Sequence, residues 1–223
     1  MLTEINDCDV ISSTNELVFE ARKLGYSTFG EMFYASHLAD FIQKILKIPA
    51  QVMHPFRDNY RIVVEHLLNY KPILIAYDYS AQFNKFTSKS GTKAHWALII
   101  GFYYVLPTKR TLILDEEKKK FKIYEQKYRS KELSINEKLK FIFDYDFNLK
   151  SLFLFARHSK TNHVCYWNFD ELCQNNFQLK NVASKYLQHG MTFKIPPNGD
   201  LESTLAQRFI LVDKKFDYWE EFL

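Results

Sequence analysis

Cysteine, glycine and proline are scarce in this sequence, and each shortage excludes a class of protein. Three cysteines among 223 residues are too few for a disulfide framework. Six glycines and six prolines argue against long flexible linkers. The longest apolar run, from Trp96 to Leu106, is shorter than the roughly 18 residues that a membrane span needs. We therefore expect a compact protein without a membrane anchor.

The excess of positive over negative residues is also small. The net charge of +4 does not form the clustered basic face of a nucleic-acid-binding protein, although it favours an acidic protein substrate. Residues 1–13 lack the basic stretch and apolar run of a secretory signal peptide. These features predict a cytoplasmic protein that binds neither nucleic acid nor membrane.

Apolar and aromatic residues are abundant by contrast. Hydrophobic residues make up 47% of the chain and aromatic residues 17%, which predicts one domain, over residues 1–223, with a packed core. The charge run that begins at Asp115 (DEEKKKFK) is followed by further lysines up to Lys140. We interpret about residues 115–150 as a solvated, Lys-rich insertion.

Helical patterns dominate the first third of the chain. Ser13 to Glu16 form a capping box, followed by an apolar face and by Gly25 as the stop. Similar patterns predict helices over about 31–47 and 59–70, which Pro49 and Pro72 close.

The pattern then changes to short apolar runs that are rich in β-branched and aromatic residues. These predict strands at 73–77, 95–104, 111–114, 152–156, 164–167, 191–195 and 209–212, with a short helix at 169–173. Helices followed by an antiparallel sheet define an α+β fold.

His95 is the strongest candidate for chemistry. It opens an apolar strand directly after the polar loop 78–92, where an imidazole would face a cleft. General acid–base catalysis needs a group that titrates near neutral pH, and imidazole does so. From position alone, a histidine that is merely hydrogen-bonded at the end of a strand is the more common explanation.

Four motifs carry a resemblance to a known family. The segment Lys93 to Ala97 contains AHWA, and Gly25 to Phe33 reads GYSTFGEMF. Pro72 to Asp78 (PILIAYD) is followed by Phe83-Asn84, and Trp167 to Asp170 (WNFD) by Asn176 to Leu179 (NFQL). In order and spacing this set resembles the actin maturation proteases, over roughly residues 25–181.

The resemblance implies a papain-like α+β fold in which His95 is the catalytic histidine. It further implies removal of the N-acetylated Met or Cys from the N-terminus of immature actin, without a metal or organic cofactor. The implied partner is the actin N-terminus, and an actin-binding protein is a second possible partner. Asp78 and Asn84, on the loop that leads to His95, are candidate substrate-binding residues, and ordinary loop capping is the alternative.

The chain departs from the family at the nucleophile. The family carries its cysteine in a PTCGL segment about thirty residues before GYT, but no PTCG sequence precedes Gly25 here. Cys8 lies too close to that motif, and its acidic neighbours Asp7 and Asp9 would raise the pKa of its thiol. We expect the sequence to start inside the domain, with the central helix and nucleophile upstream of residue 1. A catalytically inactive homologue that binds actin or an actin partner is the alternative.

Three further questions stay open. Asp115, His158 and Asn162 are candidates for the group that orients His95. His158, His163, Cys165 and Cys173 match no common zinc-ligand spacing, so Cys165 and Cys173 are expected to be buried structural thiols. Three lysines of the loop before His95 would attract an acidic substrate or simply keep the loop soluble: Lys85, Lys89 and Lys93.

Overall fold

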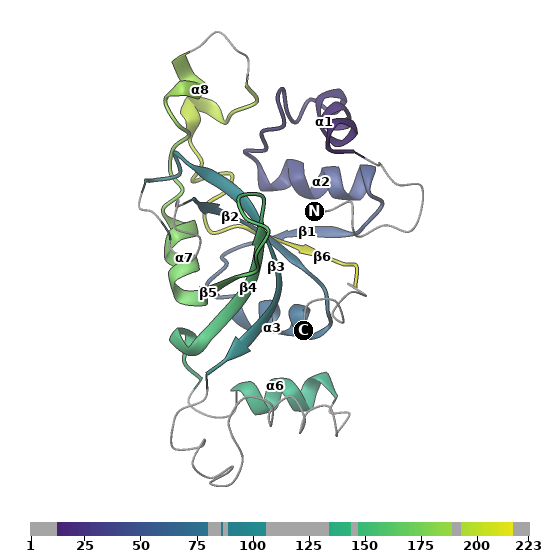
Figure 1. The fold of residues 1–223 in the computed structure, drawn as a ribbon, viewed down its shortest axis with the longest axis vertical. Helices are drawn as coiled ribbons and strands as arrows, with labels where there is room; N and C mark the ends of the chain where they lie inside the picture. Colours follow the sequence, from purple (N-terminus) through teal and green to yellow (C-terminus); the bar gives the residue numbers. More distant parts are fainter. Residues whose placement is uncertain are drawn as a thin grey trace.

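A six-stranded antiparallel sheet forms the centre of the molecule (Figure 1). The computed structural model describes residues 13–79, 86, 89–105, 134–143, 147–188 and 193–215. Neighbouring strands follow the order β1-β6-β2-β3-β4-β5. Their bounds are β1 (Ala50–Met53), β2 (Ile73–Asp78), β3 (Ala94–Tyr104), β4 (Leu152–His158), β5 (Cys165–Asn168) and β6 (Phe209–Val212).

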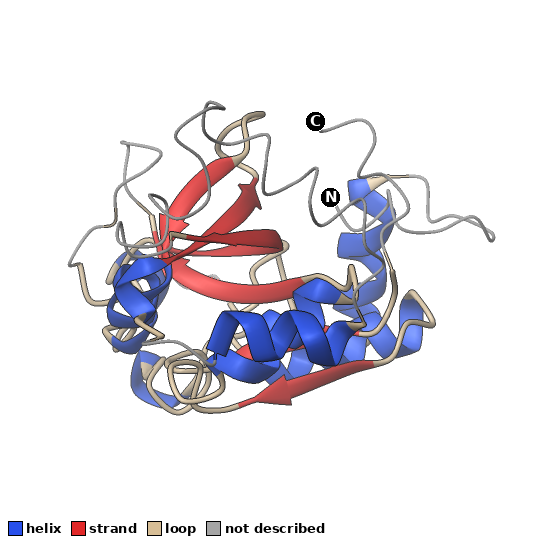
Figure 2. Cartoon of the chain, turned by 90° about the horizontal axis from the view of Figure 1, so that it is seen from below, coloured by secondary structure: helices blue, strands red, loops and turns tan. Residues whose placement is uncertain are grey.

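Helices cover both faces of this sheet, as Figure 2 shows from below. The α-helices are α1 (Thr14–Lys23), α2 (Ala35–Ile45), α3 (Tyr60–Leu68), α6 (Ile135–Phe143), α7 (Phe169–Phe177) and α8 (Lys185–Gln188). Short 3-10 turns occur at η2 (Leu149–Ser151) and η3 (Pro197–Gly199). The expected α+β class, with N-terminal helices followed by an antiparallel sheet, is confirmed and is consistent with a papain-like fold.

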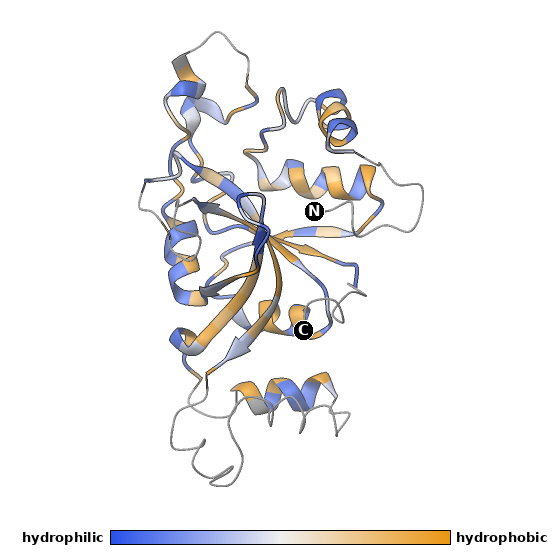
Figure 3. Cartoon of the chain, in the orientation of Figure 1, coloured by the Kyte–Doolittle hydropathy of each residue, from blue (hydrophilic) through white to orange (hydrophobic). Residues whose placement is uncertain are grey.

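Strand β2 lies between two apolar layers, which explains why its sequence is continuously apolar. Ile73, Ile75 and Tyr77 face the layer that α3 and α7 contribute to. Leu74 and Ala76 face the opposite layer, to which α2 contributes. All six residues of β2 are buried, and each large apolar side chain contributes about 1.5–3 kcal/mol by leaving water. Figure 3 shows the apolar colouring of the central strands.

The first helix begins and ends where its local sequence predicts. The Ser13 hydroxyl accepts from the Glu16 N–H at 3.3 Å, and the Glu16 carboxylate accepts from the Ser13 N–H at 3.2 Å. Gly25, just past the helix, has a φ of +74°, which glycine adopts without strain. The predicted capping box and stop are therefore confirmed.

The second helix begins later than predicted, at Ala35 and not at Glu31. The Glu31 carboxylate instead accepts the backbone N–H groups of Thr28 (2.8 Å) and Phe29 (2.6 Å). Gly30 has a φ of +98°, which ends any helical path at this point. Glu31 therefore organises a turn before the helix.

The second half of the chain brings further corrections. Residues 193–195, expected in a strand, are not in one, because the Lys194 N–H donates to the Glu31 carboxylate at 3.0 Å. Helix α7 continues to Phe177, beyond the expected Cys173. Strand β1 and helix α8 were not predicted. Helix α6 lies inside the segment interpreted as an insertion, whereas 111–114, 115–133 and 191–192 lie outside the described residues.

The described helices give no candidate for a membrane span, since none is both long and apolar enough.

Candidate active site

His95 is the second residue of β3 and lies directly opposite Tyr77 of β2. Its half-buried ring packs edge-on against Tyr79, with ring centroids 5.5 Å apart. The Tyr77 ring is 6.5 Å away on the same side of the ladder. No hydrogen bond joins the His95 ring to another of the described residues. The imidazole is therefore packed by aromatic rings and keeps its nitrogens available.

Burial holds this imidazole in its neutral form. Desolvation is the main cause that lowers the pKa of His95 to about 4, and the positive charge of Lys160 and the neighbouring His158 lower it further. A neutral imidazole at pH 7 has a free lone pair that accepts a proton from an acidic group brought next to it. Because the low pKa also makes the ring a weaker base, proton transfer to it requires a neighbouring negative charge that raises this pKa.

The loop before β3 is organised by Asp78. This fully buried carboxylate accepts backbone N–H groups from Lys89 (2.9 Å), Gly91 (3.1 Å) and Lys93 (3.1 Å). The geometry is that of loop capping, the alternative considered from the sequence, and it fixes the approach of the chain to His95. Direct contact of Asp78 with a substrate stays a prediction, and Asn84 lies outside the described residues.

Helix α7 holds the end of β2 through the adjacent residues Asn175 and Asn176. The sequence did not identify them as a pair. Asn175 pairs with the main chain of Asp78: its side-chain oxygen accepts from the N–H at 2.7 Å, and its amide donates to the carbonyl at 3.4 Å. Asn176 donates to the Ala76 carbonyl at 2.7 Å. The available signal was the second part of the fourth motif, NFQL, which begins one residue after Asn175.

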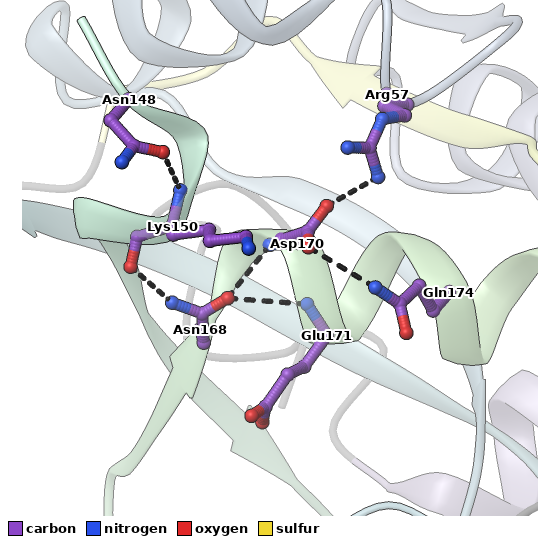
Figure 4. Close-up of polar contacts among 7 residues, drawn as sticks. All are labelled: Arg57, Asn148, Lys150, Asn168, Asp170, Glu171 and Gln174. Atoms are coloured by element: carbon purple, nitrogen blue, oxygen red, sulfur yellow. Dashed lines mark hydrogen bonds and ion pairs between the residues drawn. The ribbon is translucent and has the colours of Figure 1, made fainter.

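A polar network fixes the start of α7 and therefore the position of Asn175 (Figure 4). Asn168 caps the helix by accepting from the N–H groups of Asp170 (3.0 Å) and Glu171 (3.2 Å). Arg57 forms an ion pair with Asp170, which also accepts from Gln174 at 3.1 Å. These contacts join the loop before α3 to the helix that supports the site.

Trp96 links the histidine motif to the GEMF motif. Its indole N–H donates to the Met32 carbonyl at 2.9 Å, while its ring packs in the α2 layer. Because side chains alternate along a strand, His95 and Trp96 face opposite sides of the sheet. The motif therefore places the candidate catalytic His95 next to Trp96, which ties β3 to the GEMF segment.

His158 lies close to this site but has both ring nitrogens engaged. Its Nδ1 accepts from the Lys160 N–H at 3.2 Å, so the proton of the neutral ring is on Nε2, which faces the Cys165 sulfur at 3.4 Å. The ring also stacks on Trp167. The geometry does not favour His158 as the group that orients His95. The other two candidates are Asn162, which is exposed, and Asp115, which lies outside the described residues.

The described cysteines are structural in character. Cys165 and Cys173 are buried and free, and burial raises the pKa of both thiols. Neither is therefore a thiolate near neutral pH. Cys8 lies outside the described residues. In the part of the chain that the structure describes, no group of three His, Cys, Asp or Glu could hold a metal ion.

The α+β domain, with a half-buried histidine at the start of β3, is consistent with a papain-like fold. A family model described as "Actin maturation protease-like, C-terminal domain" matches residues 1–103. The chain is similar to three curated proteins named actin maturation protease. It is 27% identical to the one from Danio rerio over 198 residues, and 25% identical to those from Mus musculus over 206 and Drosophila melanogaster over 203.

These alignments confirm the resemblance that the motifs carried: the chain is similar to proteins named actin maturation protease. They cover 87% of this chain for the fish protein and 90% for the mouse and fly proteins. The chain spans only 61%, 54% and 60% of the length of these relatives, respectively. No solved structure matches the chain.

Proposed function

We propose that this chain provides the histidine side of a cysteine aminopeptidase that removes the N-acetylated Met or Cys from the N-terminus of immature actin. The observation that carries the proposal is the placement of His95. Its neutral ring lies on β3 with no hydrogen-bond partner among the described residues, and the AHWA motif surrounds it. The names of the related proteins support actin as the substrate.

The chemistry follows from the neutral imidazole. With a cysteine thiol beside it, His95 takes the thiol proton, and the thiolate attacks the first peptide bond of the substrate. The resulting imidazolium then gives its proton to the leaving amine. A thiolate next to the ring would raise the pKa of His95, so the low value of about 4 describes the site without that partner.

The loop that leads to His95 is proposed to hold the substrate backbone. Asp78 would act through the loop, because its carboxylate already accepts three backbone N–H groups. Asn84 is proposed as the direct contact. We place the activity in the cytoplasm, where thiols such as Cys165 and Cys173 stay reduced.

A second candidate function is favoured by the state of the described cysteines. Both are buried, and burial raises the pKa of each thiol, so neither suits a nucleophile. An inactive relative that binds actin or an actin partner through the same surface would have this arrangement.

Release of the acetylated residue distinguishes the two functions. The substrate is an N-acetylated actin N-terminal peptide, and the enzyme is this chain fused behind a PTCGL-containing segment. The enzyme proposal expects acetyl-Met in the products and its loss in the His95→Ala variant. Tight binding of the peptide by the fusion without any release would establish the second function.

A further inference from the structure

Two tyrosine rings from the end of β2 pack against the imidazole of His95. The Tyr79 ring is the nearer one, with ring centroids 5.5 Å apart and an interplanar angle of 88°. The Tyr77 ring is 6.5 Å away at an angle of 46°. Tyr77 is buried, whereas Tyr79 and His95 are both half-buried. Among the described residues, Tyr79 therefore makes the closest aromatic contact of His95.

The backbone that carries Tyr79 is held in register with the backbone that carries His95. The Tyr79 N–H donates to the Lys93 carbonyl at 3.0 Å, which extends the pairing of β2 with β3 by one hydrogen bond beyond Asp78. The main chain of Asp78 is itself fixed by the Asn175 side chain, whose oxygen accepts its N–H at 2.7 Å. The Tyr79 side chain therefore starts from a fixed point next to His95.

Contacts from the end of β4 hold the Tyr79 ring itself. The Lys160 ammonium lies 6.0 Å from the centroid of this ring, which is within the range of a cation–π contact. The His158 ring lies 6.4 Å from it at an interplanar angle of 64°. The Lys160 N–H donates to His158 at 3.2 Å, so these two contacts form one unit. The Tyr79 ring is therefore held by β4 while it packs against His95 of β3.

A perpendicular ring restricts the orientation of an imidazole without using its nitrogens. Proton transfer needs a ring nitrogen held in a defined direction, and a hydrogen-bonded side chain commonly provides this. No described residue forms such a hydrogen bond with His95. A perpendicular aromatic pair favours its packed arrangement by about two- to ten-fold over an unpacked one. Packing can therefore orient the ring and leave both nitrogens available.

We propose that Tyr79 is a positioning residue, whose ring holds the His95 imidazole in the orientation used for proton transfer. It acts by packing, so the aromatic ring and not the hydroxyl carries the role, and phenylalanine should replace it. The proposal rests on the proposed function for the reaction that His95 performs. The orientation of the imidazole is measurable without any catalysis.

The experiment follows the His95 ring signals by NMR in the intact 223-residue chain, with His95→Gln to assign them. Tyr79→Ala should shift these signals, because the ring current of Tyr79 is lost, and should raise the pKa of His95, because water reaches the imidazole. Tyr79→Phe should match the parent in both. The other charged and titratable groups that act on His95 or pack against it stay unchanged in both variants: Tyr77, Asp78, His158, Lys160 and Lys185.

The fusion that supplies a PTCGL segment tests the consequence for catalysis. Tyr79→Ala should lower kcat by about two- to ten-fold with little change in KM, because the ring orientation and not substrate binding is affected. Tyr79→Phe should restore the parent kcat. If Tyr79→Ala does not fold, Tyr79→Leu, which keeps an apolar side chain without a ring, replaces it in both measurements.

Tyr103→Ala is the matched control. Tyr103 is a half-buried tyrosine near the other end of β3, and its ring stacks on Phe153 at 4.9 Å. The control should lower stability but leave the His95 signals and kcat unchanged. Unaltered His95 signals or kcat in Tyr79→Ala, a Tyr79→Phe variant that behaves like Tyr79→Ala, or equal effects of Tyr103→Ala would overturn the proposal. An inactive fusion, with the expected His95 changes in the 223-residue chain, would remove only the proposed function.

Discussion

Tyr77 and His95 face each other across the β2–β3 ladder, with ring centroids 6.5 Å apart. The tyrosine is the deeper of the two: its side chain is buried, and its hydroxyl has no hydrogen-bond partner within the described residues. Burial raises the pKa of Tyr77, so the group stays a neutral O–H. The histidine therefore rests on a buried ring whose polar atom contributes no hydrogen bond to the described structure.

Replacing Tyr77 by Phe should leave the free energy of unfolding unchanged or raise it by up to about 1 kcal/mol. The substitution keeps the ring and removes a buried hydroxyl that has no partner, which relieves a desolvation cost. Urea denaturation of the two proteins measures the difference. A loss of more than about 1 kcal/mol would show that the hydroxyl makes a stabilising contact, such as one with a bound water.

The protonation of His95 should make stability depend on pH in a defined window. Its pKa in the folded protein, about 4, lies below the value of roughly 6.5 for an unfolded chain. The unfolded state therefore binds a proton first, and stability should fall as pH drops from about 6.5 to about 4. Because other histidines also titrate, the parent is compared with His95→Gln, which should lose less stability over this window. Identical pH profiles would contradict the low pKa.

Loss of the Asn175 side chain should be costly. Asn175→Ala removes both hydrogen bonds to the buried main chain of Asp78 and should lower the free energy of unfolding by about 2–4 kcal/mol. Hydrogen exchange at the amides of Lys89, Gly91 and Lys93 should quicken, because Asp78 holds that loop. Glu171→Ala is the control on the exposed side of α7 and should cost less than about 1 kcal/mol. Similar losses in both variants would refute the role of Asn175.

The 223-residue chain by itself should show no measurable peptidase activity. Cys165 and Cys173 are buried, and the sequence around Cys8 contains two acidic neighbours. A histidine without a nucleophile does not form the covalent intermediate, and loss of a nucleophile costs many orders of magnitude in rate. The assay is release of acetyl-Met from an actin N-terminal peptide. Activity that Cys8→Ser abolishes would make Cys8 the nucleophile.

In the fusion that supplies a PTCGL segment, His95→Ala should abolish cleavage and leave folding nearly intact, since the residue is half-buried at the mouth of a strand. His158→Ala should reduce cleavage less, because both ring nitrogens of His158 are engaged away from His95. Thermal denaturation of each variant controls for folding. A His95→Ala enzyme that cleaves at the parent rate would exclude the catalytic role.

Local signals predicted much of the fold. The capping box of α1, the strand 209–212 and the apolar strands at 73–77 and 95–104 depend on neighbouring residues, and the structure confirms them. The start of α2 and residues 193–195 could not be predicted in the same way. Both depend on the Glu31 carboxylate, which accepts N–H groups from its own turn and from Lys194. Such a contact between distant segments leaves no periodic pattern in the sequence.

The candidate site shows the same difference between features set by neighbouring residues and contacts between distant segments. His95 is a candidate from the sequence because a short motif surrounds it. The support that Asn175 gives to Asp78 joins residues 97 positions apart, so no spacing rule reveals it. The Cys165 contact with His158 is closer in sequence, but it depends on the pairing of β4 with β5 and on the ring tautomer. Motifs therefore selected the candidate catalytic residue, whereas the contacts that support its surroundings needed the three-dimensional structure.

The pairing of β3 with β4 has a practical consequence for engineering. The ladder ends at Tyr104 opposite Leu152, so the connection between them leaves and re-enters the sheet at adjacent points. This exit lies nine residues along β3 from His95, roughly 30 Å at about 3.3 Å per residue. Closing a longer loop costs only a logarithmic increment of entropy. A fluorescent reporter or an affinity tag inserted there should therefore leave the chemistry at the opposite end of the strand undisturbed.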